Sequence, residues 1–241
     1  MLEAFAWSVF AASSLLIGAW LARARAPSDR ALGLIMAFGA GALISSVAFE
    51  LIEKAFIRAG GTGAVIAGFF VGALAFYVGD RLIRRAGGGN RKSTTRADGD
   101  SAKAIALGTV LDGIPESVVI GMTLLGGGGV GAAIVAGVFV SNLPEAMAAS
   151  SSLSRTGVAW PRIMAMWLVI VLASGLAAAV GFVALADANR AVGAFILAFA
   201  GGAILTMLAS TMMPEAYKHG GEIVGIVTAL GFAAAFAIGT L

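Results

Sequence analysis

Two short stretches of this chain carry the same chemical pattern. Asp112-Gly-Ile-Pro-Glu116 and Ser141-Asn-Leu-Pro-Glu145 each place a Pro-Glu pair inside an apolar run. Proline has no N–H to donate and disrupts the helical bond to the carbonyl four residues earlier. The pattern therefore predicts that the carbonyls of Leu111 and Val140 are free to face a polar cavity.

Helical spacing gathers further oxygen atoms beside each glutamate. Asp112 is four residues from Glu116, so both lie on one helix face, and Asn142 and Ser141 precede Glu145 by three and four residues. We expect these five side chains to form an all-oxygen site for one or two divalent cations, because hard cations prefer carboxylate and carbonyl ligands.

Buried carboxylates need compensation. Each ionisable side chain at the centre of a bilayer costs at least about 2.5–3.5 kcal/mol, and no Lys or Arg lies within the core of an apolar segment. A bound cation would offset this cost for Asp112, Glu116 and Glu145. The alternative is that the acids stay protonated and the prolines only kink their helices.

The elements that carry these residues are membrane spans. Hydrophobic residues make up 59% of the 241 residues, charged residues 12%, and the mean hydropathy is +0.96, whereas soluble domains are about 25% charged. A helix needs roughly 20 apolar residues to cross a bilayer. Eight segments meet this length requirement approximately. They are residues 3–22, 31–53, 62–84, 103–126, 129–153, 161–186, 190–213 and 221–240. The chain has no cysteine.

The basic residues predict the orientation of these spans. Thirteen of the 16 Lys and Arg residues fall on one side of the eight-span arrangement, and only Lys54, Arg58 and Arg190 on the other. Because basic residues accumulate on the cytoplasmic side, we expect both termini outside the cytoplasm. Residues 85–102 then form a flexible cytoplasmic loop within a single transmembrane domain, 1–241.

An internal repeat links distant spans. Ala37–Ala48 in the second span and Ala198–Ala209 in the seventh agree at five positions without a gap. An even-numbered and an odd-numbered span run in opposite directions, so the repeats would be inverted, which is a hallmark of transporters. The predicted fold is an all-α integral membrane protein with eight transmembrane helices in a 3+2+3 arrangement with inverted repeats.

The two motifs and the two repeats resemble the ZIP (Zrt/Irt-like) metal transporters over essentially the whole chain. The resemblance rests on LDGIPESVVIG from Leu111 and VSNLPEAMAAS from Val140, supported by the segments from Phe38 and Phe199. It implies an elevator-like uptake carrier for zinc, iron, manganese or related ions in a cell (plasma or inner) membrane, with the metal centre between spans four and five. The ion is the substrate, and no organic cofactor is expected.

This chain departs from the family pattern at several ligand positions. Asp112 and Gly113 stand where the family usually has His and Asn, Ser141 stands where a His is frequent, and Ala178 stands where some members have a bridging Glu. Glu116, Glu145 and Asn142 match the pattern. The loss of imidazole shifts the expected preference toward harder ions.

Other ionisable side chains are expected near the ends of the spans. Glu50 and Glu215 are expected near the two mouths of a path, either as pathway residues or as interfacial charges in water. Asp80 and Arg81 are expected to form an interfacial ion pair, and His219 is expected in the loop after span seven.

Other classes of protein remain as alternatives. Asp80 after Gly79 faintly resembles an intramembrane aspartyl protease, but position 77 is Tyr, and we expect no enzyme. A proton-coupled carrier of a non-metal solute and a non-transporting relative with a decayed metal site also stay open. Lipid and metal ions are the expected partners, a homodimer is allowed, and nucleic acid is not expected.

Overall fold

The computed structural model describes residues 1–24, 28–61, 63–85, 101–126 and 129–240. Within these residues the chain is helical, with no strand, and most of the predicted 85–102 loop lies outside them. The elements in chain order are α1 (Leu2–Ala24), α2 (Asp29–Ser46), the π-helical segment η1 (Val47–Glu53), α3 (Lys54–Ala59), α4 (Gly63–Arg85), α5 (Ser101–Thr123), the 3₁₀ turn η2 (Leu124–Gly126), α6 (Ala132–Arg155), α7 (Trp160–Leu185), α8 (Arg190–Met207), the π-helical segment η3 (Leu208–Met212), α9 (Met213–Gly220) and α10 (Val224–Gly239).

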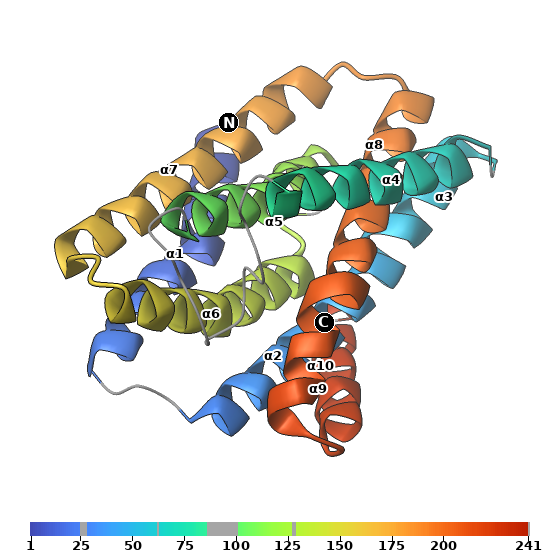
Figure 1. Cartoon of the computed structure of the whole chain (residues 1–241). Helices are drawn as coiled ribbons and strands as arrows, with labels where there is room; N and C mark the ends of the chain where they lie inside the picture. Colours follow the sequence, from blue (N-terminus) through green and yellow to red (C-terminus); the bar gives the residue numbers. More distant parts are fainter. Residues whose placement is uncertain (25–27, 62, 86–100, 127–128, 241) are drawn as a thin grey trace.

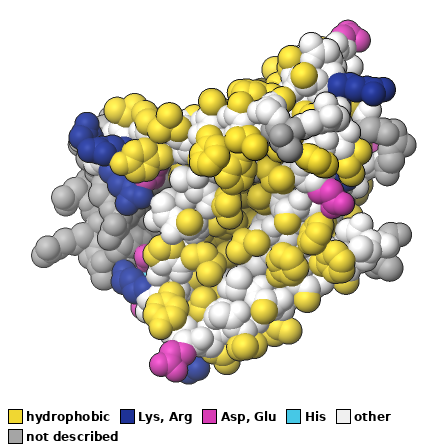
Figure 2. Space-filling view, turned by 90° about the vertical axis from the view of Figure 1, so that its right-hand side faces the viewer, with side chains coloured by type: hydrophobic (Ala, Val, Ile, Leu, Met, Phe, Trp, Pro, Cys, Tyr) yellow, Lys and Arg dark blue, Asp and Glu magenta, His cyan; other side chains and the backbone are white. Residues whose placement is uncertain are grey.

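Seven helices in the described part of the chain are long and apolar enough to cross a membrane. The last helix, α10, is apolar but has only 16 residues. The architecture is therefore all-α and consistent with a multi-pass membrane protein. Figure 2 shows hydrophobic side chains across the middle of one face, with most of the visible charged side chains toward its edges.

Two long rods share a common design. α2, η1 and α3 form one continuous helical rod over Asp29–Ala59, and α8, η3 and α9 form another over Arg190–Gly220, each 31 residues long. Ser28 caps the first rod by accepting a bond from the Ala31 N–H at 3.2 Å, and Asn189 caps the second by accepting one from the Val192 N–H at 2.8 Å. These caps satisfy helix donors that lack an intrahelical partner.

The matching continues to the far ends of the rods. Each rod changes to π-helix at the same position, from Val47 and from Leu208. Each ends at a glycine with positive φ, Gly60 at 62° and Gly221 at 73°. Caps, π segments and terminal glycines are all related by one constant offset in the sequence, which is also the offset of the repeat found above. The repeat thus covers the whole of both rods.

The rods are longer than the sequence analysis predicted. The second span was expected to end at residue 53 and the seventh at 213, where charged residues lower the hydropathy. The helices instead continue to Ala59 and Gly220, because their backbone bonds persist until a glycine adopts a positive φ. The expectation of His219 in a loop was therefore wrong, since His219 lies in α9.

The helices pack in two groups. In the first group α1 lies against α6 and α7, and α5 lies against α7. In the second group α4 lies along α8, α10 lies along α2, and the two rods also touch each other through α9 and α3. Figure 1 shows α10 beside α2 and α6 in front of α1. The main contact between the groups is α2 against α6, whereas α5 touches α8 much less.

Matched glycines bring the helices of the second group into backbone contact. A Cβ on Gly41 would lie 1.9 Å from the carbonyl oxygen of Thr228 in α10, and one on Gly202 would lie 2.0 Å from that of Phe69 in α4. Only glycine allows so close an approach, which is how membrane helices pack without a hydrophobic driving force. The two contacts occupy equivalent places in the two repeats.

Candidate metal centre

The two Pro-Glu motifs lie inside continuous helices. Pro115 is within α5 and Pro144 within α6, and neither helix ends at its proline. Gly18 of α1 packs so closely on α6 that a Cβ there would lie 2.4 Å from the carbonyl oxygen of Leu143, next to Pro144. On the other side, Ser8 of α1 donates a 3.0 Å bond to the carbonyl of Ser174 in α7. These contacts hold α1 and α7 beside the motif helices.

A small polar void lies at the centre of the first helix group. Its free volume is about 10 Å³, on the order of what one water molecule needs. Four helices contribute polar side chains to its wall. They are Ser8 from α1, Thr109, Glu116 and Ser117 from α5, Asn142 from α6 and Ser174 from α7.

The void brings together one carboxylate and one amide from the two predicted motifs. Glu116 is 2% exposed and Asn142 9% exposed, so both are held away from the surface. Apolar side chains, among them Ile120 and Val138, complete the wall. Oxygen atoms that converge in so small a space can replace part of the hydration shell of a hard cation.

Glu145 of α6 is linked to the wall of the void through a residue of α5. Thr109, which lines the void, donates a 3.0 Å hydrogen bond from its Oγ1 to Oε1 of Glu145. This is a direct side-chain link between the two motif helices. Glu116 and Asn142 therefore line one void, and Glu145 of α6 is bonded to Thr109, a residue of α5 in its wall.

Two other predicted ligands lie differently. Asp112 is 5% exposed, one turn before Glu116, but it is not among the residues that line the void. Ser141 donates its hydroxyl to the carbonyl of Val138 at 3.0 Å. Its backbone packs on α2, where a Cβ on Gly39 would lie 2.9 Å from the Ser141 Cα. The structure thus assigns Ser141 to a helix contact and does not bring it to the void.

Within the described residues no three His, Cys, Asp or Glu side chains lie close enough together to hold one ion. The polar wall of the void consists instead of hydroxyls around Glu116 and Asn142. The sequence motifs did not predict four polar residues of this wall, Ser8, Thr109, Ser117 and Ser174. Thr109 and Ser117 could have been found, since they lie within one or two helical turns of Glu116, but Ser8 and Ser174 are single serines in distant apolar helices.

Tight packing explains the small residue at position 178. A Cβ on Gly121 of α5 would lie 2.4 Å from the carbonyl oxygen of Ala178, and Ala178 is completely buried. The backbones of α5 and α7 therefore touch at this level. Ala178 thus lies fully enclosed where two helix backbones meet.

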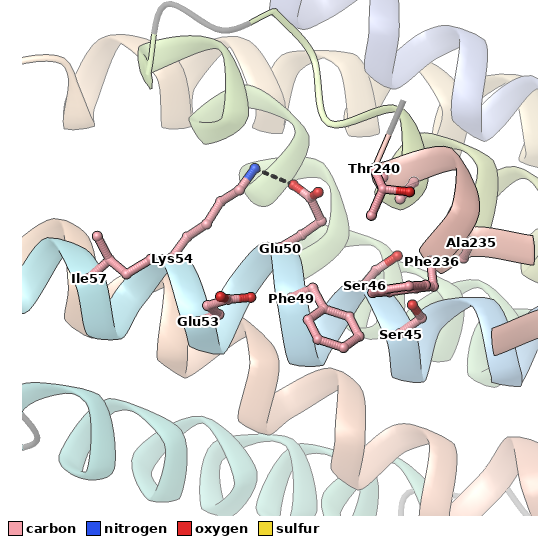
Figure 3. Close-up of a pocket in the computed structure, with 12 residues that line it drawn as sticks. Ser45, Ser46, Phe49, Glu50, Glu53, Lys54, Ile57, Ala235, Phe236 and Thr240 are labelled. Carbon is pink, nitrogen blue, oxygen red and sulfur yellow. Dashed lines mark hydrogen bonds and ion pairs between the residues drawn. The ribbon is translucent and has the colours of Figure 1, made fainter. Parts of the chain in front are cut away.

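The two acids predicted near the mouths are both in ion pairs. Glu50 lies in η1, is 8% exposed and bonds to Nζ of Lys54 at 2.5 Å. Glu215 lies in α9, where its Oε1 is 3.0 Å from Nε2 of His219 and 3.6 Å from Nζ of Lys218. Figure 3 shows Glu50 and Lys54 facing a hollow between the first rod and α10.

Asp80 differs from expectation in its partner. Its carboxylate pairs with Arg84, whereas Arg81 bonds to the hydroxyl of Tyr77 at 2.8 Å, so the predicted pair with Arg81 was wrong. The neighbouring Gly79 packs on the side chain of Leu111, at 3.1 Å from a Cβ to Cδ1. α4 therefore touches α5 just beside Asp112.

A scan against protein-family models found no match to this chain, and a search of curated proteins found none either.

Proposed function

We propose that this protein carries divalent metal cations across a membrane through the polar void between α1, α5, α6 and α7. The observation that carries the proposal is the convergence of Glu116 and Asn142, one from each Pro-Glu motif, on a single buried void. A carboxylate at this depth is costly unless a cation or a proton compensates it. The surrounding hydroxyls and the amide add neutral oxygen ligands, which suit a transported ion because they bind without holding it permanently.

The proposed topology has eight spans, with α10 as the eighth and both termini outside the cytoplasm. Its support is the 13-to-3 distribution of basic residues. Two contacts support this topology, because each joins residues that it places on one side of the membrane. The Arg23 guanidinium lies 5.9 Å from the ring centroid of Trp160, and Arg58 packs against Gly193. The membrane proposed is the plasma or inner membrane.

Inverted repeats are the second support for transport. The residue-by-residue match of the two rods and the paired glycine contacts favour the 3+2+3 arrangement, in which α1–α4 and α7–α10 are the repeats. In transporters of this kind the substrate site lies between the repeats near the middle of the membrane. Two of the helices that line the void, α5 and α6, lie between the repeats in the sequence.

The packing of the motif helices breaks this symmetry. α6 lies closely on the first rod, where Gly137 faces Leu43 and Gly39 faces Ser141, whereas α5 touches the second rod only lightly. Exchanging the roles of the repeats gives a second state, with α5 packed on α8 and α6 loosened from α2. Movement of the first helix group against the second would then expose the void to opposite sides in turn.

The proposal is tested by uptake of Mn²⁺ into proteoliposomes that contain the purified chain. We expect saturable uptake that Glu116→Gln abolishes. Ser141→Ala is the matched control and keeps near-parental uptake, because that hydroxyl bonds to Val138 and not to the void. Absence of uptake for Mn²⁺, Fe²⁺ and Zn²⁺ by the parent would refute the proposal. Proton movement without any metal dependence would favour the proton-coupled carrier.

A further inference from the structure

A vestibule opens beside Glu50 at one end of the molecule. Two adjoining hollows of about 330 and 490 Å³ share Glu50, Lys54 and Gly239 in their walls. The first lies between the first rod and the end of α10 (Figure 3), and the second extends to Thr123 at the end of α5. The vestibule is therefore continuous around the Glu50–Lys54 pair.

The helix that leads down from the vestibule also lines the metal centre. Thr123 in the vestibule wall is seven residues, about 10 Å of helix, beyond Glu116. Ile120 lies between them, lines the void and is completely buried. A buried apolar side chain thus lies between Glu116 and the vestibule along α5.

The Glu50 carboxylate is fixed inside the vestibule. It lies in π-helical η1, a type of segment that is frequent at functional sites. A Cβ on Gly131 would lie 3.1 Å from its Oε2, and one on Gly239 would lie 3.6 Å from its Oε1. The carboxylate thus sits between the start of α6 and the end of α10, in space that two glycines leave. The N-terminus of α6 favours negative charge at this place.

Lys54 is far more exposed than its partner. Its side chain is 53% exposed, whereas that of Glu50 is 10% exposed. An exposed lysine loses rotamer entropy when it is held in one geometry, which offsets part of its attraction to the carboxylate. A divalent ion at the position of the ammonium would interact with the carboxylate twice as strongly, by its double charge.

The charges around the vestibule cancel in the present state. Glu50 and Glu53 contribute two negative charges, and Lys54 and Arg58 two positive ones. Arg58 packs on α8, with its Nε 2.7 Å from a Cβ on Gly193. Lys54 is the cation bonded to the buried carboxylate. In the second repeat the position equivalent to Lys54 is Glu215, so a cationic group at this place is a property of the vestibule and not of the repeat.

We propose that Lys54 is a tethered competitor: its ammonium occupies Glu50 in the vestibule, and an entering divalent cation binds Glu50 by displacing it. Lys54 then sets the concentration at which the vestibule fills. This inference rests on the proposed function, because it treats the vestibule as an entrance for the transported ion.

The test reads vestibule occupancy without transport. Thr240 lines the vestibule and is exposed, and the chain has no cysteine, so Thr240→Cys gives a single thiol there. The rate at which a positively charged, impermeant methanethiosulfonate modifies this thiol is measured against Mn²⁺ concentration. We expect Mn²⁺ to protect the thiol. Lys54→Met should lower the half-protecting concentration about tenfold, since one competing charge is removed at hydrogen-bond distance.

Three further variants control this result. Lys54→Arg keeps the charge and should leave the midpoint within about twofold, Arg58→Met should shift it much less than Lys54→Met, and Glu50→Gln should remove protection. No protection in the parent, an equal midpoint in Lys54→Met, or protection that persists in Glu50→Gln would each overturn the inference. Mn²⁺ uptake by the parent and by Glu116→Gln, measured in parallel, separates the two proposals. Protection of the thiol with no Mn²⁺ uptake in any variant would refute only the transport function. Uptake without protection of the thiol would refute only the vestibule inference.

Discussion

The hydroxyl of Thr109 in α5 donates a 3.0 Å hydrogen bond to Oε1 of Glu145 in α6. The two helices make few other contacts, since α5 packs mainly on α7 and α6 mainly on α1 and α2. This bond therefore couples the two halves of the candidate centre. It also holds the Glu145 carboxylate beside the void, because Thr109 lines the void that Glu116 and Asn142 share.

Replacing Thr109 tests this coupling. Thr109→Val keeps the shape but deletes the donor, and we expect a loss of about 1–3 kcal/mol of stability together with weaker half-saturation by Mn²⁺. Thr109→Ser restores the donor and should restore both properties. The measurements are thermal unfolding and uptake in parallel. A Val variant indistinguishable from the parent would show that the bond does not position Glu145.

The glycine contacts between the repeats are a second target. Gly41→Ala and Gly202→Ala would each force a Cβ to within about 2 Å of a backbone oxygen, and overpacking of this kind costs at least about 1–3 kcal/mol. We expect both variants to unfold at clearly lower temperature. Gly225→Ala in α10 is the control, because a Cβ there meets nothing within 4 Å. It should be neutral or slightly stabilising, since alanine favours helix. Equal effects at all three glycines would contradict the packing account.

The orientation can be tested by single cysteines. Arg91 lies outside the described residues, in the segment predicted to be cytoplasmic, and Thr240 is near the other end. An impermeant thiol reagent added to intact cells should label Thr240→Cys and leave Arg91→Cys unlabelled until the membrane is opened. Labelling of position 91 from outside would reverse the proposed topology.

The nature of the ligands predicts the ion preference. The candidate centre offers oxygen atoms from Glu116, Asn142 and nearby hydroxyls, and the described residues place no imidazole or thiolate there. Such ligands suit Mn²⁺ and other hard ions. In competition assays we expect Mn²⁺ and Fe²⁺ to compete effectively with Zn²⁺. An exclusive preference for Zn²⁺ would be inconsistent with this set of ligands.

The sequence allowed the helical architecture and the repeat to be predicted, but only in part. The repeat was visible between Ala37 and Ala48 because small residues there are constrained by close packing. Its continuation to Gly60 and Gly221 was not recognised, since the equivalent residues differ in chemistry, as Lys54 and Glu215 do. Hydropathy also ended both rods early, because it records charge and not backbone hydrogen bonding.

The centre was predictable where chemistry repeats locally. Glu116, Asn142 and Glu145 were predicted from the motifs; Glu116 and Asn142 line the same void, and Glu145 is bonded to Thr109 in its wall. Ser8 and Ser174 could not be identified, because a serine in an apolar helix gives no local signal and their proximity depends on tertiary packing. Ser141 as a ligand stays a prediction: its spacing fits a ligand, while its backbone packs on α2 and its hydroxyl bonds to Val138.

The proposed function requires Glu116 and Glu145 to bind a metal ion. Its most direct test is the shift in melting temperature that Mn²⁺ causes in the purified parent, in Glu116→Gln and in Glu145→Gln. A neutral amide is cheaper to bury than a charged carboxylate and still offers an acceptor oxygen, so both variants should fold without metal. Ser141→Ala serves as the control and should keep the parental shift. We expect a clear upward shift in the parent that shrinks in both Gln variants, and equal shifts in the parent and the two Gln variants would contradict the metal-centre proposal.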